Sequence, residues 1–337
     1  YVNLGYEAGA LNVDASVRHD RQGATGTANI ATAALRYDPA TVQRVDYDLS
    51  HNSYSVGANY RLSGGLALFA LGLSLIFGIM RLVNLAHGDL ILLAAYLVLS
   101  ATTALGLPLV TASLLVVAAM FVLGFVLQRL VLERVLGDDI LPPLLVTFGL
   151  SIVIQNGLLL GYGADSRRLQ AGAFESSSVT LAPGLSVGLA PLTALVTAIA
   201  AVALLQLIFY RTWLGRAFRA TADNPAIAQL MGVNERNVYA IAVGLSLAVS
   251  VIAAVVFGIR ASFDPSIGPA RLLYAFEAVI IGGLGSLWGT LAGGIVLGLA
   301  QAIGGRINPE WQILAGHLTF LAVLMVRPRG LFPARRT

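Results

Sequence analysis

Seven long stretches of this chain contain no charged side chain, and they limit what it can fold into. They cover residues 62–80, 90–128, 140–164, 176–210, 237–259, 278–305 and 311–326. A helix that crosses a bilayer needs about 20 apolar residues, and a water-soluble core does not need unbroken apolar runs of this length. Only 11% of the 337 residues are charged, whereas soluble domains average roughly a quarter. The sequence therefore predicts an all-α polytopic membrane protein.

Cysteine and lysine are both absent from the sequence. Without cysteine the chain has no thiolate metal site, disulfide or cysteine nucleophile. Without lysine it has neither a phosphate-binding P-loop nor a Schiff-base nucleophile. No Ser–His–Asp or metal-ligand cluster stands out, so we expect no enzymatic activity, no cofactor and no metal site. The formal net charge of +4 does not indicate nucleic-acid binding, because the arginines lie at the ends of apolar runs.

The first 62 residues follow a different pattern from the rest. In 11–18 and 54–62 apolar and polar residues alternate, which is typical of β-strands. Residues 54–70 resemble a strand pair from TonB-dependent outer-membrane receptors. A membrane barrel needs at least about 8 strands, so we interpret 1–62 as a fused or misjoined fragment or a partly ordered β-patterned extension. A genuine small β-domain is the alternative, and 63–337 is the predicted transmembrane domain.

The apolar runs predict about seven spans plus one glycine-broken hairpin. The run 90–128 is too long for one span and divides at Gly106–Pro108, because proline favours a turn. The loop 210–237 and the tail 327–336 each hold four arginines, which places both in the cytoplasm. A basic cytoplasmic tail then requires that 273–300 enter the membrane and return. The glycines at 282–285 favour the sharp turn that this hairpin needs.

Residues 72–89 place several polar side chains among apolar neighbours, and buried polar groups must be paired. Asn84 and His87 have the spacing of one helix face, and Asp89 follows two residues later. We interpret Asn84, His87 and Asp89 as lining a pathway or fixing a break in a helix. The alternative is that they are interfacial residues at a helix end.

A second polar stripe lies in the run 140–164. Thr147, Ser151 and Gln155 are spaced at i, i+4 and i+8 and share one helix face. Two roles remain open for this stripe, hydrogen bonding between helices and lining of a pathway.

Glycines recur at short intervals near the C-terminus, and small residues allow helix backbones to approach closely in a membrane. The positions that we expect to pack helices are Gly282, Gly283, Gly285, Gly289 and Gly293. Packing within the subunit and packing at a subunit interface both remain open. Glu277 heads this stretch, where it either pairs with an arginine such as Arg260 or Arg271 or contacts the transport pathway.

Four stretches in order resemble the permeases of branched-chain amino acid importers of the ATP-binding cassette (ABC) type. They are GLSLIFGIMRLVNLAHGD at 72–89, GRAFRATADNPAIAQLMGVN at 215–234, EAVIIGGLGSLWGTLAGGIVLG at 277–298 and RPRGLFP at 327–333. The resemblance covers about residues 66–333. It implies a permease subunit in the bacterial inner membrane, with several spans and a cytoplasmic C-terminus. The implied partners are a second homologous permease, two ATP-binding subunits that hydrolyse ATP, a periplasmic substrate-binding protein and membrane lipid.

By the same resemblance, residues 215–234 form the loop that contacts the ATPase. The residues expected to form this loop are Gly215, Arg216, Arg219, Ala226, Ala228 and Gly232. The loop is similar to the EAA loop of importer permeases, with Ala226 in place of the usual Glu. Asp223 or Asn224 can cap a short helix there, with Pro225 in its first turn. The alternative is an amphipathic helix on the bilayer surface.

Two other functions remain open on the sequence alone. A permease for urea or short amides has the same fold and partners by resemblance. An ion-coupled secondary transporter belongs to a different class and needs acids within the membrane. Asp89 and Glu277 are the candidate acids, and both lie near the ends of apolar runs.

Overall fold

The computed structural model describes residues 2–8, 11–29, 42–58, 64–137, 139, 141–174, 177–182 and 185–333. The chain divides into two compact units, Tyr1–Tyr60 with Ser178–Val187, and Arg61–Ser177 with Gly188–Thr337. The long helices all belong to the second unit.

The first unit contains an antiparallel sheet with the strand order β1-β2-β3. Its strands are β1 (Val2–Ala8), β2 (Leu11–Asn29) and β3 (Val42–Ala58). The register places Val17 opposite both Val2 and Tyr54, so the two segments of alternating polarity are paired with each other. Strands β4 (Ser178–Ala182) and β5 (Leu185–Gly188) form a separate two-stranded sheet. Residues 59–63 lie outside the described residues, so the boundary at residue 62 and the origin of 1–62 stay predictions.

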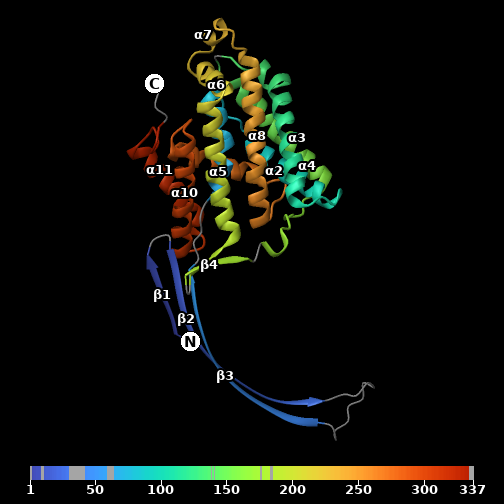
Figure 1. Ribbon diagram of the computed structural model, residues 1–337, viewed down its shortest axis with the longest axis vertical. Coiled ribbons are helices and arrows are strands. Elements are labelled where there is room, and N and C mark those ends of the chain that lie inside the picture. Colours follow the sequence, from blue (N-terminus) through green and yellow to red (C-terminus); the bar gives the residue numbers. More distant parts are fainter. Residues whose placement is uncertain are drawn as a thin grey trace. The chain divides into compact units, whose positions relative to one another are not determined.

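The second unit is a bundle of helices (Figure 1). In chain order they are α1 (Gly64–Met80), α2 (His87–Thr103), α3 (Leu109–Leu130), η2 (Leu132–Arg134), α4 (Leu141–Tyr162), η3 (Gly172–Phe174), α5 (Leu189–Arg211), α6 (Trp213–Asp223), α7 (Pro225–Leu230), α8 (Glu235–Arg260), α9 (Gly268–Gly282), α10 (Leu287–Ile307) and α11 (Trp311–Val326).

Five of the described helices are long and apolar enough to cross a membrane: Leu109–Arg134, which joins α3 to η2, and α4, α5, α8 and α10. Three shorter apolar helices, α1, α2 and α11, coincide with other predicted runs. The predicted break at Gly106–Pro108 separates α2 from α3, and Gly106 has a φ of 64°, a conformation that favours glycine. The count of about seven spans stays a prediction.

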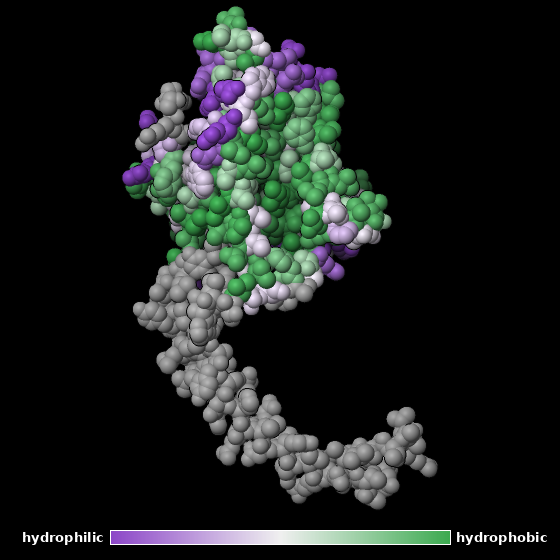
Figure 2. All heavy atoms as spheres, viewed as in Figure 1, coloured by the Kyte–Doolittle hydropathy of each residue, from purple (hydrophilic) through white to green (hydrophobic). Residues whose placement is uncertain are grey.

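Helix α8 occupies the centre of the bundle, where it packs against α1, α2 and α3. The backbones of α3 and α8 nearly touch, because a Cβ on Gly124 would lie 2.9 Å from Gly244 Cα. Helices α3 and α4 instead expose large apolar side chains such as Leu114, Val122 and Leu160. Figure 2 shows an apolar band on this face of the bundle, as a surface that contacts lipid requires.

Helices α9 and α10 form the predicted glycine-broken hairpin. Gly283 and Gly285 lie in the turn with φ of 107° and 78°, which an L side chain rarely adopts. A Cβ on Gly289 would overlap the carbonyl of Gly282, and one on Gly293 would overlap the carbonyl of Ala278. These contacts make the two helices antiparallel and show that the glycines pack helices within the chain. The hairpin is longer than predicted, because its helices extend beyond 273–300 at both ends.

The segment after α11 closes over the turn of this hairpin. The amides of Leu331 and Phe332 donate to the carbonyls of Ile281 and Gly282 at 2.8 and 3.0 Å. These two carbonyls lie in the last turn of α9, where a helix has no backbone N–H groups left to donate to them. The tail therefore supplies the C-terminal cap of α9, a role that the sequence pattern did not indicate.

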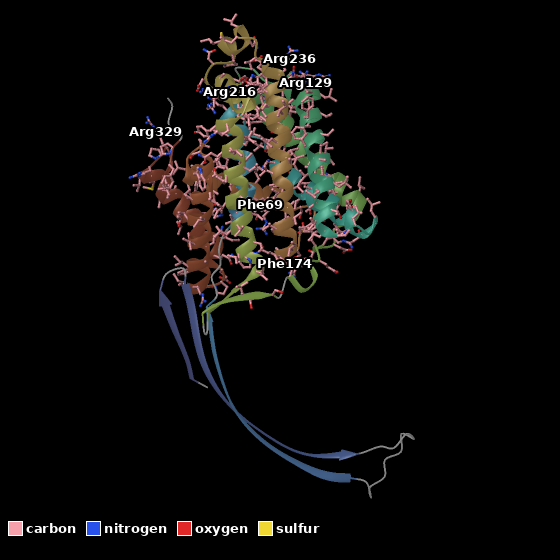
Figure 3. The ribbon with its side chains drawn as sticks, in the orientation of Figure 1. Phe69, Arg129, Phe174, Arg216, Arg236 and Arg329 are labelled. Atoms are coloured by element: carbon pink, nitrogen blue, oxygen red, sulfur yellow. The ribbon has the colours of Figure 1, made fainter. Side chains whose placement is uncertain are left out.

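The two ends of the bundle differ in charge. Arg129, Arg216, Arg236 and Arg329 lie toward the end that carries α6 and α7, whereas Phe174 lies toward the other end (Figure 3). Glu133 links two of these arginines, with its carboxylate oxygens 3.2 Å from Arg129 and 3.0 Å from Arg236. This end of the bundle is the one expected to face the cytoplasm.

Candidate functional site

The polar residues predicted from 72–89 lie at a break between α1 and α2. Helix α1 ends at Met80, and Arg81 has a φ of 53°, a left-handed conformation that commonly terminates helices. Asn84 then organises the turn, because its side-chain oxygen accepts from the amide of Ala86 at 3.0 Å and its carbonyl accepts from the amide of His87 at 3.1 Å. Asn84 therefore lies in a break between two helices and hydrogen-bonds within it.

His87 is fully buried at the start of α2 and ties this helix to α1. Its Nε2 lies 3.3 Å from the carbonyl oxygen of Phe69, which Figure 3 shows near the middle of the bundle. A carbonyl only accepts hydrogen bonds, so Nε2 carries the proton. Gly72 makes room for the imidazole, because a Cβ there would lie 2.8 Å from His87 Cε1. His87 Nδ1 has no hydrogen-bond partner among the described residues.

Asp89 is fully buried and connects α2 to the polar stripe of α4. Ser151 Oγ donates to Asp89 Oδ2 at 2.5 Å, and Gln155 Nε2 donates to Ser151 Oγ at 2.9 Å. The amide of Leu85 donates to Thr147 Oγ1 at 3.2 Å. The stripe predicted from helical spacing therefore faces the break and hydrogen-bonds to it. Asp89 also lies in the first turn of α2, where the helix dipole favours a carboxylate.

The first residue of α9 seals the other side of this break. A Cβ on Gly88 would overlap the carbonyl oxygen of Gly268, and a Cβ on Gly268 would overlap Asp89 Oδ1. The start of α9 therefore packs directly against the backbone of Gly88 and the side chain of Asp89 at the start of α2. Neither Gly88 nor Gly268 stood out from the sequence, because a single glycine in a turn gives no sign of what it touches.

Glu277 does not join this cluster. It is buried on α9, and its carboxylate hydrogen-bonds to His317 Nδ1 of α11. The structure thus pairs Glu277 with a histidine in place of the arginine considered from the sequence. Arg271 instead stacks on the ring of Phe257, with its Cζ 4.6 Å from the ring centroid. The sequence could have indicated this partner, because His317 is the one histidine in the apolar run 311–326.

The second predicted site, the loop 215–234, forms α6 and α7. Helix α6 is capped by Thr212, whose side chain accepts from the amide of Gly215 at 3.1 Å. Gly215 lies directly against the Phe209 backbone, to which the Arg219 guanidinium also donates. Phe218 is fully buried and packs against Phe209 with ring centroids 5.3 Å apart and ring planes tilted by 36°. Helix α6 is therefore fixed to the end of α5.

Helix α7 projects from this end of the bundle (Figure 1). Asn224 caps it by accepting from the amide of Ile227 at 3.1 Å, with Pro225 in the first turn, as predicted. Gly232 ends the turn with a φ of 84°. Leu230 and Met231 are 86% and 80% exposed, and Figure 2 shows an apolar tip at α7 beyond a more polar surface. The predicted residues Gly215, Arg216, Arg219, Ala226, Ala228 and Gly232 all fall on α6, on α7 or in the turn that follows.

Within the described ranges, no three His, Asp or Glu side chains come together as metal ligands. Three buried polar atoms at the break can each form a further hydrogen bond. They are Asn84 Nδ2, His87 Nδ1 and Asp89 Oδ1, which have no hydrogen-bond partner in the described part of the chain. Such an arrangement can bind water or a polar group.

A family model for the permease component of branched-chain amino acid transport systems matches residues 59–325. The chain belongs to this family. The match begins close to α1 and ends within α11, so it includes the α1–α2 break, helices α6 and α7, and the α9–α10 hairpin.

Individual relatives of the permease agree with this assignment. The high-affinity branched-chain amino acid permease protein BraD of Pseudomonas aeruginosa is 28% identical over 83% of this chain and 93% of its own length. The corresponding LivH of Escherichia coli K12 is 28% identical with the same coverages. LivM of Escherichia coli K12, which carries the same description, is 25% identical over 80% of this chain and 68% of its own length.

Proposed function

We propose that the chain is the membrane permease of a binding-protein-dependent ABC importer for branched-chain amino acids. The observation that carries the proposal is the family match over residues 59–325. Both BraD and LivH are described as branched-chain amino acid permease proteins. As a permease component the chain is not itself an enzyme, and the energy for transport comes from ATP hydrolysed by two separate subunits.

A second, homologous permease completes the membrane part of the transporter. The support is that this chain is similar to both LivH and LivM of one organism, and the two carry the same description. A periplasmic substrate-binding protein delivers the amino acid. The location is the bacterial inner membrane.

The function is tested by uptake of labelled leucine, isoleucine and valine into proteoliposomes that contain the full complex and the binding protein. We expect uptake that requires ATP and is not abolished by a protonophore. Uptake of labelled urea or acetamide with no uptake of leucine would favour the amide permeases. Uptake that needs an ion gradient and no ATP would favour an ion-coupled transporter.

The orientation that we propose places α6, α7 and the tail in the cytoplasm. Because α9 and α10 are antiparallel, the start of α9 and the end of α10 then face the periplasm. Single cysteines at Ala270 and Ile307, both exposed, are expected to react with a membrane-impermeant maleimide from the periplasmic side. A cysteine at Met231 is the control and should react from the cytoplasmic side only. Labelling of positions 270 and 307 from opposite sides would overturn the hairpin topology.

Residues 1–60 are dispensable for transport in this proposal, because the family match begins at residue 59. Deleting them is expected to leave membrane insertion and the rate of leucine uptake within about twofold of the full chain. Insertion is measured by quantitative blotting of the membrane fraction. A deletion variant that is absent from the membrane despite normal synthesis would show that the strands are structural.

A further inference from the structure

A cavity of about 340 Å³ lies among the ends of five helices, α1, α8, α9, α10 and α11. Its residues on α8 belong to the last turns of that helix, remote from the junction of α7 and α8. The cavity therefore lies toward the end of the bundle that the proposed orientation turns to the periplasm. Its volume is within the range of about 300–1,000 Å³ that small-molecule sites occupy.

The walls of the cavity combine apolar surface with a few polar groups. Leu66 and Phe69 of α1 and Val256 and Phe257 of α8 supply apolar surface. Arg260 of α8 and Arg271 of α9 each supply a guanidinium. Specific sites for small molecules have this composition, in which the apolar part supplies binding energy and a few polar groups set the orientation.

Arg271 contacts two aromatic rings and still has a hydrogen-bond donor without a partner among the described residues. Its Cζ lies 4.6 Å from the ring centroid of Phe257 and 5.9 Å from that of Tyr274. Contacts of this kind use the positive charge of the guanidinium and do not satisfy its N–H groups. The Nε of Arg271 is buried and has no hydrogen-bond partner among the described residues. A buried donor without a partner is costly, so an acceptor brought by a ligand would be stabilised there.

We propose that this cavity is a substrate site of the permease, in which Arg271 binds the carboxylate of the amino acid and the apolar walls contact its branched side chain. A guanidinium recognises a carboxylate through two parallel hydrogen bonds. Leu66, Phe69 and Phe257 can take up an aliphatic side chain without a polar partner. The proposal rests on the proposed function and adds to it the place where the substrate first meets the permease.

The charge of the site is tested by a cysteine at Gln301, which lines the cavity in a chain that has no other cysteine. In the full complex, the rate at which an anionic methanethiosulfonate (a sulfonate) modifies this cysteine is compared with the rate for a cationic one (a trimethylammonium). In the parent, the anionic reagent should be favoured by about tenfold more than in the Arg271→Gln variant, since a cation nearby attracts it. Saturating leucine should slow the reaction, and Arg271→Gln should remove this protection.

Arg167→Gln is the matched control, because Arg167 pairs with Phe263 in the backbone just after α8 and does not line the cavity. It should leave both the reagent preference and the protection unchanged. A cysteine at Gln312, which also lines the cavity, serves as the second reporter if Gln301→Cys fails to assemble. An unchanged reagent preference in Arg271→Gln, or leucine protection that survives it, would overturn the site.

Transport measurements distinguish a failure of this site proposal from a failure of the proposed function. Arg271→Gln should raise the KM for leucine delivered by its binding protein by about tenfold or more, the loss expected for a hydrogen-bonded charge, and Arg271→Lys should recover part of it. If the unmodified complex imports no branched-chain amino acid, the proposed function fails. If it imports leucine and Arg271→Gln does so with an unchanged KM, the function stands and the site fails.

Discussion

Replacing Gly88 with valine is expected to prevent the permease from accumulating in its folded state. A Cβ at this position overlaps the carbonyl oxygen of Gly268 and lies 3.1 Å from Leu272 Cβ. Overpacking a core costs about 1–3 kcal/mol when side chains can shift. Here the obstacle is backbone, so we expect a loss above about 3 kcal/mol, out of a total stability of about 5–15 kcal/mol.

The amount in the membrane fraction and the thermal unfolding midpoint in detergent measure this loss. Gly149→Val is the matched control, because Gly149 is also helical and a Cβ on it meets no atom within 4 Å. This control adds the same side chain to a helix without the overlap. Equal midpoints for the two variants would show that α2 and α9 do not need their direct contact.

Replacing Leu230 with aspartate is expected to separate the permease from its ATPase while leaving the permease folded. Leu230 is 86% exposed at the tip of α7, so the change removes no contact within the chain. If α7 inserts this tip into an apolar pocket of the ATPase, the carboxylate would have to be buried without a partner. Losses of 2 kcal/mol or more are typical of such central positions, which corresponds to about thirtyfold weaker binding.

Co-purification of the ATPase and leucine-stimulated ATP hydrolysis are the two measurements. Leu105→Asp is the control, because Leu105 is an exposed residue of similar type in the α2–α3 turn. Only the Leu230 variant should lose the ATPase. Normal recruitment by that variant would favour the alternative in which α6 and α7 rest on the bilayer surface.

The sequence indicates those features whose cause is local. Uncharged runs mark the helices, Asn224 and Pro225 mark the start of α7, and the spacing of Thr147 and Gln155 marks residues that share one face of α4. Each of these depends on neighbours within a few turns of the chain, which is why pattern and propensity were sufficient.

The sequence does not indicate which distant segments meet. The contact of Gly88 with Gly268, the partner of Glu277 and the cap that Leu331 gives to α9 all join residues far apart in the chain. A buried acid in an apolar run requires a partner, but the choice between Arg271 and His317 depends on how α11 docks. The cavity at Arg271 follows from the packing of five helix ends and has no counterpart in any short motif.

Helix α9 contacts the backbone of other segments at both of its ends. At one end Gly268 abuts Gly88, and at the other the amides of Leu331 and Phe332 hold its last carbonyls. Its 15 residues span about 22 Å at 1.5 Å per residue. Side chains can absorb a small shift by changing rotamer, whereas two backbones in contact leave no slack. We infer that α9 moves as a rigid unit, so that a displacement of the C-terminal tail also displaces the polar break between α1 and α2.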